Sequence, residues 1–185
     1  MTEKTPDAPI KVRPAIPADA GEIARVHVAS WQSTYRGIVP QPILDGLSIE
    51  RRAEFWERLL REPGENRTWV GEMDGVIVGF AGTSRTTEPD LVSGIGELES
   101  IYLLPRAKGV GLGRLLLRAA TRDFMERGLT SAILWVFTAN ERARRFYEAA
   151  GWGLDGAAQT HDFGGTAVEA IRYRIDLPGS TPSST

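Results

Sequence analysis

Residues 97–117, ELESIYLLPRAKGVGLGRLLL, change from a strand pattern to a helix pattern across a glycine-rich turn. At the start of this stretch apolar residues alternate with the carboxylates Glu97 and Glu99, which indicates a buried strand. From Leu112 onward the apolar residues recur at helical spacing. Between the two patterns, glycine occupies every second position from 109 to 113. The chain is therefore predicted to contain a strand, a tight glycine turn and a helix in direct succession.

This succession predicts an anion-binding site. Glycines have no Cβ, so their backbone N–H groups approach a ligand closely. The first N–H groups of a helix have no partner within the helix, and they carry a partial positive charge. A strand, a glycine turn and a helix N-terminus together favour an anion, and the usual anion in such a place is a phosphate group.

Two common phosphate-binding motifs do not fit these glycines. A P-loop requires Gly-x-x-x-x-Gly-Lys-Ser/Thr, but Gly113 is followed by Arg114 and Leu115, so the hydroxyl that binds Mg²⁺ is missing. A dinucleotide fingerprint requires Gly-x-Gly-x-x-Gly. Residues 109–111 begin it, but Arg114 stands where the third glycine belongs. Two interpretations of the glycine turn remain: a third kind of phosphate-binding motif, and an ordinary strand–helix turn that binds no ligand.

Residues 108–113 resemble the signature of GNAT superfamily N-acetyltransferases, Arg/Gln-x-x-Gly-x-Gly/Ala, which follows a strand ending in Val/Leu-x-Pro. Counted from Pro105, the match begins at Lys108, which replaces Arg or Gln. Residues 106–111 match literally but lie too close to the proline. The Lys108 register is preferred because most of such a site is main-chain N–H, which tolerates a changed side chain.

A second motif lies further along the chain. Residues 140–152, NERARRFYEAAGW, are similar to the family's Asn-x-x-Ala-x-x-x-Tyr-x-x-x-Gly-Phe, with Trp152 at the final aromatic position. The predicted order of elements also agrees with the family: strand, two helices, three strands, helix, strand, helix, two strands. The helix between strands 97–104 and 131–137 is a crossover, so these two strands should be parallel. The resemblance covers residues 10–177.

The resemblance implies a mixed α/β (α+β) fold. In the GNAT fold a central mixed, mostly antiparallel sheet of about six or seven strands has a splayed parallel pair in its middle, and about four helices flank it. The dipeptide Asp74-Gly75 is a strong hairpin turn, and residues 36–42 break the first helix. Strands are expected at residues 10–13, 69–73, 76–82, 97–104, 131–137, 152–154 and 167–175, with helices from residues 19, 48, 112 and 140.

The composition excludes several other classes of protein. A net charge of −2 gives no general attraction to nucleic acid or to an anionic membrane. No stretch approaches the roughly 20 apolar residues of a membrane span. The absence of cysteine excludes disulfides, thiolate zinc sites and a cysteine nucleophile. His27 and His161 are far apart without a cluster of ligands around them, so no metal is expected.

The chain length suits one domain. We expect it at residues 10–177, with flexible tails at residues 1–9 and 178–185, which are rich in Pro, Ser, Thr and Gly. The N-terminus lacks the apolar segment of a secretion signal, so a cytoplasmic location is expected. Whether the chain forms a homodimer stays open.

The resemblance implies acetyl-coenzyme A (acetyl-CoA) as cosubstrate and no metal. The backbone of residues 101–103 should pair with the pantetheine amides as an added strand would, and the amides around residues 109–114 should hold the pyrophosphate. Asn140 should hydrogen-bond the pantetheine arm, although it also suits a helix cap. The implied cofactor residues are Ile101, Tyr102, Leu103, Lys108, Gly109, Val110, Gly111, Leu112, Gly113, Arg114 and Asn140.

Acetyl transfer to an amine needs a base, a polarised thioester carbonyl and a proton for the leaving thiolate. Glu97 and Glu99 have equal parity on the strand, so both are predicted to point to one side. The resemblance makes Glu97 the first candidate for the base, acting through water, and Glu99 the second; each could instead pair with an arginine. By the same resemblance, the N–H of Leu103 is the oxyanion donor and Tyr147 the general acid, unless Tyr147 is a core residue.

Trp31 and Tyr35 lie where family members build the acceptor pocket, although Trp31 also fits a helix core. The implied activity is transfer of an acetyl group to a primary amine of a small molecule or a peptide N-terminus, by direct attack in a ternary complex. Two alternatives stay open: a non-catalytic acyl-CoA-binding sensor, and an acyltransferase that uses a longer acyl group. The sequence does not name the acceptor.

Overall fold

The computed structural model describes residues 9–178 of the chain. The predicted tails therefore lie outside the described residues, apart from Pro9 and Pro178. Within that range the strands form one mixed sheet in the order β1-β2-β3-β4-β5-β7-β6. The strands are β1 (Ile10–Pro14), β2 (Arg67–Met73), β3 (Val76–Arg85), β4 (Ile95–Leu103), β5 (Ser131–Phe137), β6 (Gly153–Asp162) and β7 (Ala167–Asp176).

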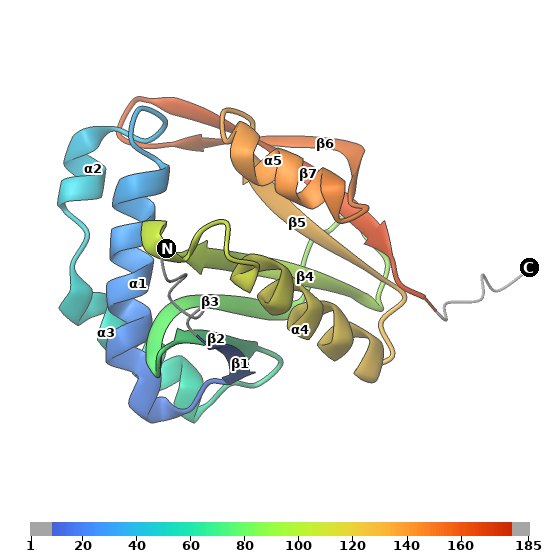
Figure 1. Ribbon diagram of the computed structural model, residues 1–185. Coiled ribbons are helices and arrows are strands. Elements are labelled where there is room, and N and C mark those ends of the chain that lie inside the picture. The colour runs from blue at the N-terminus through green and yellow to red at the C-terminus, as the bar shows by residue number, and fades with distance from the viewer. Residues whose placement is uncertain (1–8, 179–185) are drawn as a thin grey trace, which may run out of the picture.

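Helices cover both faces of the sheet (Figure 1). Trp56 of α3 packs with α1 residues against Phe80 of β3 on one face. Leu112 and Leu116 of α4 pack against Val78 on the other face, which α5 shares. The helices are α1 (Ala20–Thr34), α2 (Gln41–Asp45), α3 (Ile49–Arg61), α4 (Leu112–Glu126) and α5 (Glu141–Ala149), with short 3₁₀ turns at Pro17–Asp19 and Pro105–Ala107. No helix among residues 9–178 combines the length and apolar character needed to cross a membrane.

The two central strands, β4 and β5, are parallel and separate after a short contact. Residues 95–97 of β4 pair with residues 131–133 of β5. Beyond that point β4 stays paired with β3 up to Leu103, and β5 with β7 up to Phe137. The other adjacent pairs are antiparallel. The predicted parallel pair and its splay are therefore confirmed, and the edge of β4 that faces the gap has no ladder partner among residues 9–178.

A β-bulge interrupts β4 at the start of the splay. Leu98 is opposite Thr83 and Ser100 is opposite Gly82, so Glu99 is the extra residue. A bulge bends its strand and re-aims the side chains next to it. The prediction that Glu97 and Glu99 point to one side assumes strict alternation of side chains along the strand. The bulge interrupts this alternation at Glu99.

Several local signals act as predicted. Asp74 and Gly75 have φ angles of 52° and 75°, which a two-residue hairpin of the mirror-image type requires. The hydroxyl of Ser48 accepts a hydrogen bond from the N–H of Arg51 at 3.1 Å and caps α3. Gly151, with φ of 90°, follows the end of α5. Each of these elements depends on a few neighbouring residues, which is why the sequence alone indicates it.

Three local details differ from the prediction. The short helix α2 forms at residues 41–45 and overlaps the end of the predicted break at residues 36–42. Strand β6 extends over Gly153–Asp162 rather than stopping at residue 154, because its pairing with β7 holds a segment of low strand propensity. The carboxylate of Asp19 precedes α1 without capping it; instead it accepts two hydrogen bonds from Arg13, at 2.7 and 2.9 Å.

Gly96 of β4 gives a direct test of the core packing. A Cβ at this position would lie 2.5 Å from Cδ1 of the buried Phe124 ring. Gly96→Ala is therefore expected to lower stability by about 1–3 kcal/mol, because the core must be overpacked to accept the methyl group. Gly21→Ala in α1 is the matched control, since a Cβ there meets nothing within 4 Å and should stabilise the helix slightly. Equal melting temperatures for the two variants would contradict the packing.

Candidate active site

A cavity of about 320 Å³ opens where β4 separates from β5. Its wall combines the end of β4, the glycine turn, the start of α4 and one side of α5. The lining residues are Thr34, Ile101, Leu103, Lys108, Gly109, Gly111, Gly113, Arg114, Asn140, Arg142, Ala143, Phe146 and Tyr147. Most of the cofactor residues predicted from the sequence thus share one cavity, which we call the slot.

Three of the predicted cofactor residues do not line the slot. Tyr102 stacks its ring on His27, with the ring centroids 5.3 Å apart. The side chain of Leu112 is fully buried in the core, and that of Val110 is about half exposed. Because their predicted contacts are made by the backbone, the directions of these side chains leave the prediction untested.

The glycine turn presents a row of free backbone donors. Gly109 and Gly111 have φ angles of 90° and 92°, a conformation that side chains with a Cβ rarely adopt. Helix α4 begins at Leu112. Within residues 9–178, the N–H groups of residues 109–113 donate no hydrogen bond. Unused N–H groups at a helix start are suited to a phosphate group.

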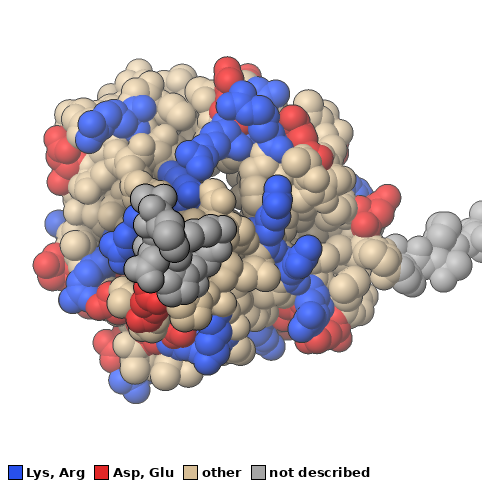
Figure 2. Space-filling view, in the orientation of Figure 1, with Lys and Arg blue, Asp and Glu red and all other residues tan. Residues whose placement is uncertain are grey.

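Positively charged side chains flank the same turn. Lys108, Arg114 and Arg142 line the slot, and Figure 2 shows Lys and Arg side chains on both sides of the hollow in this face. The Nζ of Lys108 donates to the hydroxyl of Thr34 at 3.1 Å. Burial lowers the pKa of Lys108, and the nearby Arg142 lowers it further. A bound anion would relieve this repulsion, so the slot favours a multiply charged phosphate ligand.

A second cavity, of about 160 Å³, lies directly beside the slot. The two cavities share Ile101, Asn140, Ala143 and Tyr147, so they meet at the end of the splay. We call the second one the acceptor cavity. Its lining residues are Trp31, Tyr35, Leu98, Glu99, Ser100, Ile101, Tyr102, Trp135, Val136, Phe137, Asn140, Ala143, Tyr147, His161 and Ala170.

The two candidate bases occupy different places. Glu99, at the bulge, lines the acceptor cavity, whereas Glu97 lines neither cavity. Glu97 accepts a hydrogen bond from the hydroxyl of Thr86 at 3.1 Å. Burial raises the pKa of Glu97; the Thr86 bond opposes this, and the charges of Glu99 and Glu88 add to it. Within residues 9–178 neither Glu97 nor Glu99 forms an ion pair with arginine.

Tyr147 and Asn140 stand at the junction of the cavities. Tyr147 is buried against Phe146 and Trp152, and its hydroxyl makes no hydrogen bond within the described residues. Burial raises its pKa well above the ordinary value, so the phenol keeps its proton. Asn140 caps α5 by accepting from the N–H of Ala143 at 3.2 Å. The cap is confirmed, and within residues 9–178 the amide nitrogen of Asn140 makes no hydrogen bond.

A sequence model of the Acetyltransferase (GNAT) family matches residues 27–152, which is more than half of the chain. The chain belongs to the GNAT family. It is thus an N-acetyltransferase, a member of the acyltransferases, as the two sequence motifs predict.

Related proteins and structures agree with this assignment. The uncharacterized N-acetyltransferase YuaI of Bacillus subtilis is 33% identical over 144 residues, which cover 76% of this chain and 78% of YuaI. The mycothiol acetyltransferase of Frankia alni is 38% identical over 125 residues, which cover 64% of this chain but 34% of that protein.

Solved structures share the fold. The PaiA N-acetyltransferase of Thermoplasma acidophilum, in complex with coenzyme A, has a TM-score of 0.69 and 19% identity, covering 90% of this chain and 99% of its own. The structure of yncA from Salmonella typhimurium, with its cofactor acetyl-CoA, has a TM-score of 0.70 and 18% identity. The match covers 95% of this chain and 98% of the yncA chain. At these identities the likeness confirms the fold alone.

In this GNAT protein, Trp31 and Tyr35 both line the second cavity, and their role in binding an acceptor stays a prediction. The hydroxyls of Tyr35 and Tyr102 lie 3.4 Å apart, and burial raises the pKa of both. His27 is a core histidine: its Nδ1 accepts from the indole N–H of Trp56 at 3.3 Å, and burial lowers its pKa to about 4. His161, on the exposed strand β6, lines the acceptor cavity opposite Phe137.

Sequence reasoning missed Trp135 and Phe137 as cavity residues, because an apolar strand reads as core on both faces. Trp135 and Phe137 are two positions apart on one strand, so their side chains lie on the same face, and both come after the point where the strands were predicted to separate. These two facts were the sequence signal for a shared cavity wall. It also missed Phe146, which lines the slot from α5 beside Arg142. The position of His161 depends on the extension of β6 along β7.

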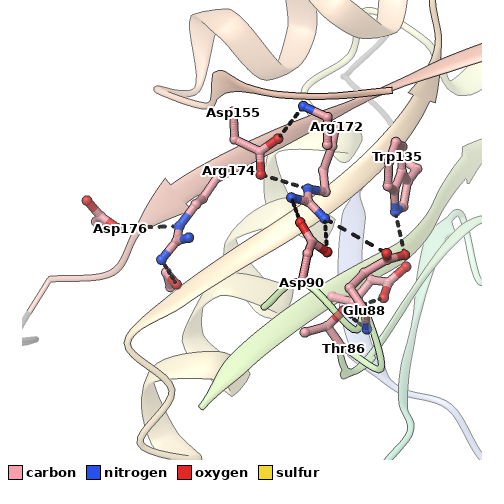
Figure 3. Close-up of polar contacts among 11 residues, drawn as sticks. Thr86, Glu88, Asp90, Trp135, Asp155, Arg172, Arg174 and Asp176 are labelled. Atoms are coloured by element: carbon pink, nitrogen blue, oxygen red, sulfur yellow. Dashed lines mark hydrogen bonds and ion pairs between the residues drawn. The ribbon is translucent and has the colours of Figure 1, made fainter. Parts of the chain in front are cut away.

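A buried cluster around Arg172 of β7 fixes one wall of the acceptor cavity (Figure 3). Arg172, only 4% exposed, donates to both oxygens of Asp90 at 3.0 and 2.6 Å and to Asp155 at 2.7 Å. Its guanidinium lies 5.4 Å from the ring centre of Trp135, and the indole N–H of Trp135 donates to Glu88 at 3.0 Å. The cluster ties the β3–β4 loop to strands β5, β6 and β7.

Arg172→Met is expected to lower the free energy of unfolding by about 3 kcal/mol. This is the lower end of the usual cost of removing one partner of a buried ion pair, and it applies because Asp90 is half exposed. The measurement is denaturant unfolding at neutral pH. Arg145→Met, which removes an exposed pair with Glu141 on α5, is the control and should cost less than about 1 kcal/mol. Equal losses in the two variants would contradict the cluster's role.

The same variant has a pH signature. Hydrogen bonding to Arg172 lowers the pKa of Asp90. A carboxyl group whose pKa is lower in the folded state than its unfolded-state pKa of about 3.9 stabilises the fold at pH values above about 3.9. This stabilisation is lost as the pH falls through the lower, folded-state pKa. The stability gap between the parent and Arg172→Met should therefore narrow below about pH 4.

Proposed function

We propose that this GNAT protein moves an acetyl group from acetyl-CoA to a primary amine, by direct attack within a ternary complex. The observation that carries the proposal is the meeting of the two cavities at Ile101, Asn140, Ala143 and Tyr147. One cavity has free N–H groups and cations for a phosphate-bearing ligand, and the other has a carboxylate for an amine. Their junction is the one place where a thioester and an amine could meet.

The slot suits acetyl-CoA part by part. The edge of β4 at residues 101–103 has no ladder partner on the side of β5, so its backbone groups suit the pantetheine amides. The free N–H groups of residues 109–113 suit the pyrophosphate of acetyl-CoA. Arg114 and Arg142 suit the 3′-phosphate on its adenosine. The amide nitrogen of Asn140 suits the pantetheine arm. PaiA and yncA, solved with coenzyme A and acetyl-CoA, support this choice of cosubstrate. Backbone N–H groups and the flanking cations hold the pyrophosphate in this arrangement, so the proposal includes no metal ion.

The chemistry follows from the junction. The ammonium group loses a proton to a carboxylate, and the free amine nitrogen attacks the thioester carbonyl carbon to form the C–N bond. The N–H of Leu103 holds the negative oxygen that develops. The C–S bond then breaks as the phenol of Tyr147 gives its proton to the departing thiolate, and the second proton that the nitrogen loses returns to the phenolate. We assign the base to Glu99, because it lines the acceptor cavity; Glu97 would act from behind it, through water.

The test is a screen of amines with acetyl-CoA that follows free thiol release. Acetyl-CoA should also raise the melting temperature, whereas NAD and ATP–Mg²⁺ should not; a ligand at a hundredfold excess over Kd stabilises by about 2.7 kcal/mol. Tight binding without thiol release for any amine would favour a sensor. Faster release with longer acyl-CoA compounds would favour a different acyl donor.

Tyr147→Phe is expected to lower kcat at least about tenfold, which is about 1.4 kcal/mol of transition-state stabilisation. The melting temperature and the Kd for acetyl-CoA should hardly change, because the ring stays packed and the hydroxyl has no protein partner. Tyr173→Phe is the matched control: that buried tyrosine donates to Glu148 at 2.6 Å and lines neither cavity. A lower melting temperature with unchanged kcat in Tyr147→Phe would make Tyr147 a core residue only.

A further inference from the structure

The acceptor cavity has an unusual wall for a site that receives an amine. Six aromatic side chains line it, from α1, β4, β5 and α5: Trp31, Tyr35, Tyr102, Trp135, Phe137 and Tyr147. Among the described residues that line it, Glu99 is the one carboxylate, no lysine or arginine takes part, and His161 is the other titratable side chain. The wall therefore offers one carboxylate, several ring faces and no lysine or arginine to pair with an anionic substrate.

The rings hold one another in fixed positions. Trp31 and Tyr35 meet edge to face with centroids 4.9 Å apart, and Tyr35 and Phe137 do so at 5.2 Å. Such pairs prefer these offset or perpendicular arrangements and are stabilised by them. Trp135 is fixed from behind by Arg172 and by its hydrogen bond to Glu88. The cavity is therefore preformed, and a ligand must fit its shape.

The size and charge of the cavity restrict the acceptor. Its volume of about 160 Å³ is below the about 300–1,000 Å³ of pockets for drug-sized ligands, so the acceptor is compact. Ring faces attract an ammonium group, and Glu99 pairs with one. A carboxylate or a second ammonium on the acceptor would be desolvated among the rings without a partner, which is costly.

We propose that the acceptor is a compact primary monoamine whose single ammonium group is carried on an aromatic or branched apolar body without an anionic group. This inference rests on the proposed acetyl transfer. The ammonium lies toward Glu99 and the junction with the slot, and the apolar body lies against Tyr35, Phe137 and Trp135. An amino acid, a polyamine or an extended peptide each brings polar groups that this wall leaves unpaired.

The experiment compares kcat/KM for matched amines by thiol release. Phenethylamine and 3-methylbutylamine carry the proposed body, phenylalanine adds a carboxylate to the first, and putrescine has a second ammonium in place of the apolar body. We expect kcat/KM for phenethylamine to exceed those for phenylalanine and putrescine by about 100-fold, since each of them buries an unpaired charge. A tripeptide with a free N-terminus is the fifth substrate and should also be poor.

Variants locate the effect in the cavity. Phe137→Leu should raise KM for phenethylamine about tenfold, with little change in KM for acetyl-CoA, because it removes a ring from the acceptor cavity and leaves the slot intact. Phe55→Leu, on the partly exposed surface of α3, is the control and should leave both values unchanged.

The outcomes separate the two proposals. If phenylalanine, putrescine or the tripeptide is the better substrate, the acceptor proposal is overturned while acetyl transfer stands. If none of the amines releases thiol from a protein that binds acetyl-CoA, both proposals are overturned. The expected ranking, together with the KM effect of Phe137→Leu, supports the compact apolar monoamine.

Discussion

Glu99→Gln is expected to lower kcat by about 10²–10⁴-fold at neutral pH, the usual cost of losing a general base. Glu99 lines the cavity that we propose for the amine, and it is the extra residue of the β-bulge in β4. Glutamine keeps the shape of the side chain but cannot take up the proton of an ammonium group. The loss should shrink as pH rises, because more of the amine is then already free.

The measurement is kcat against pH for the parent, Glu99→Gln and the matched variant Glu97→Gln. Glu97 lines neither cavity and accepts a hydrogen bond from Thr86, so its loss should cost less than about tenfold. The reverse result, with Glu97→Gln impaired and Glu99→Gln active, would move the base to Glu97 and place a water between it and the amine. Full activity in both variants would assign the proton transfer to solvent.

Gly111→Val is expected to weaken acetyl-CoA binding by at least about 100-fold. Its φ of 92° is strained for any residue with a Cβ, so the turn must shift away from its present shape. A hydrogen bond to a charged group contributes about 1.5–3 kcal/mol, so losing one or two N–H contacts to the pyrophosphate is enough for this effect. The measurement is Kd by calorimetry, together with the thermal shift caused by acetyl-CoA.

The control must carry the same backbone strain away from the slot. Gly165, in the turn between β6 and β7, has φ of 91°, and a Cβ there meets nothing within 4 Å. Gly165→Val should therefore lose stability in the same way as Gly111→Val while keeping its affinity for acetyl-CoA. Unchanged affinity in Gly111→Val would remove the pyrophosphate from the glycine turn.

The slot was largely predictable from sequence because it is built from contiguous residues. The turn at residues 108–113 needs glycines with positive φ, and α4 starts where the apolar spacing changes at Leu112. The crossover helix requires β4 and β5 to be parallel, which brings Asn140 and Tyr147 on the next helix beside the turn. Local conformation and chain connectivity are enough to place these groups.

The acceptor cavity depends on contacts between distant segments, so the sequence alone indicated only part of it. Trp31 comes from α1, Trp135 from β5 and His161 from β6, and the packing of the whole sheet brings them together. The cluster that holds Trp135 joins Arg172 to Asp90, 82 positions apart. No local pattern predicts such a pair.

The sequence by itself determined the strand, the glycine turn and the helix, because each follows from propensity or spacing within a short segment. The crossover helix predicted the parallel pair, and the resemblance to the family implied its splay. Only the tertiary structure decided which carboxylate lines the acceptor cavity. Strict alternation along β4 makes Glu97 and Glu99 equivalent, but pairing with β3 introduces a bulge at Glu99. The extra residue re-aims the strand, so Glu99 lines the acceptor cavity, while Glu97 lines neither cavity and accepts a hydrogen bond from Thr86.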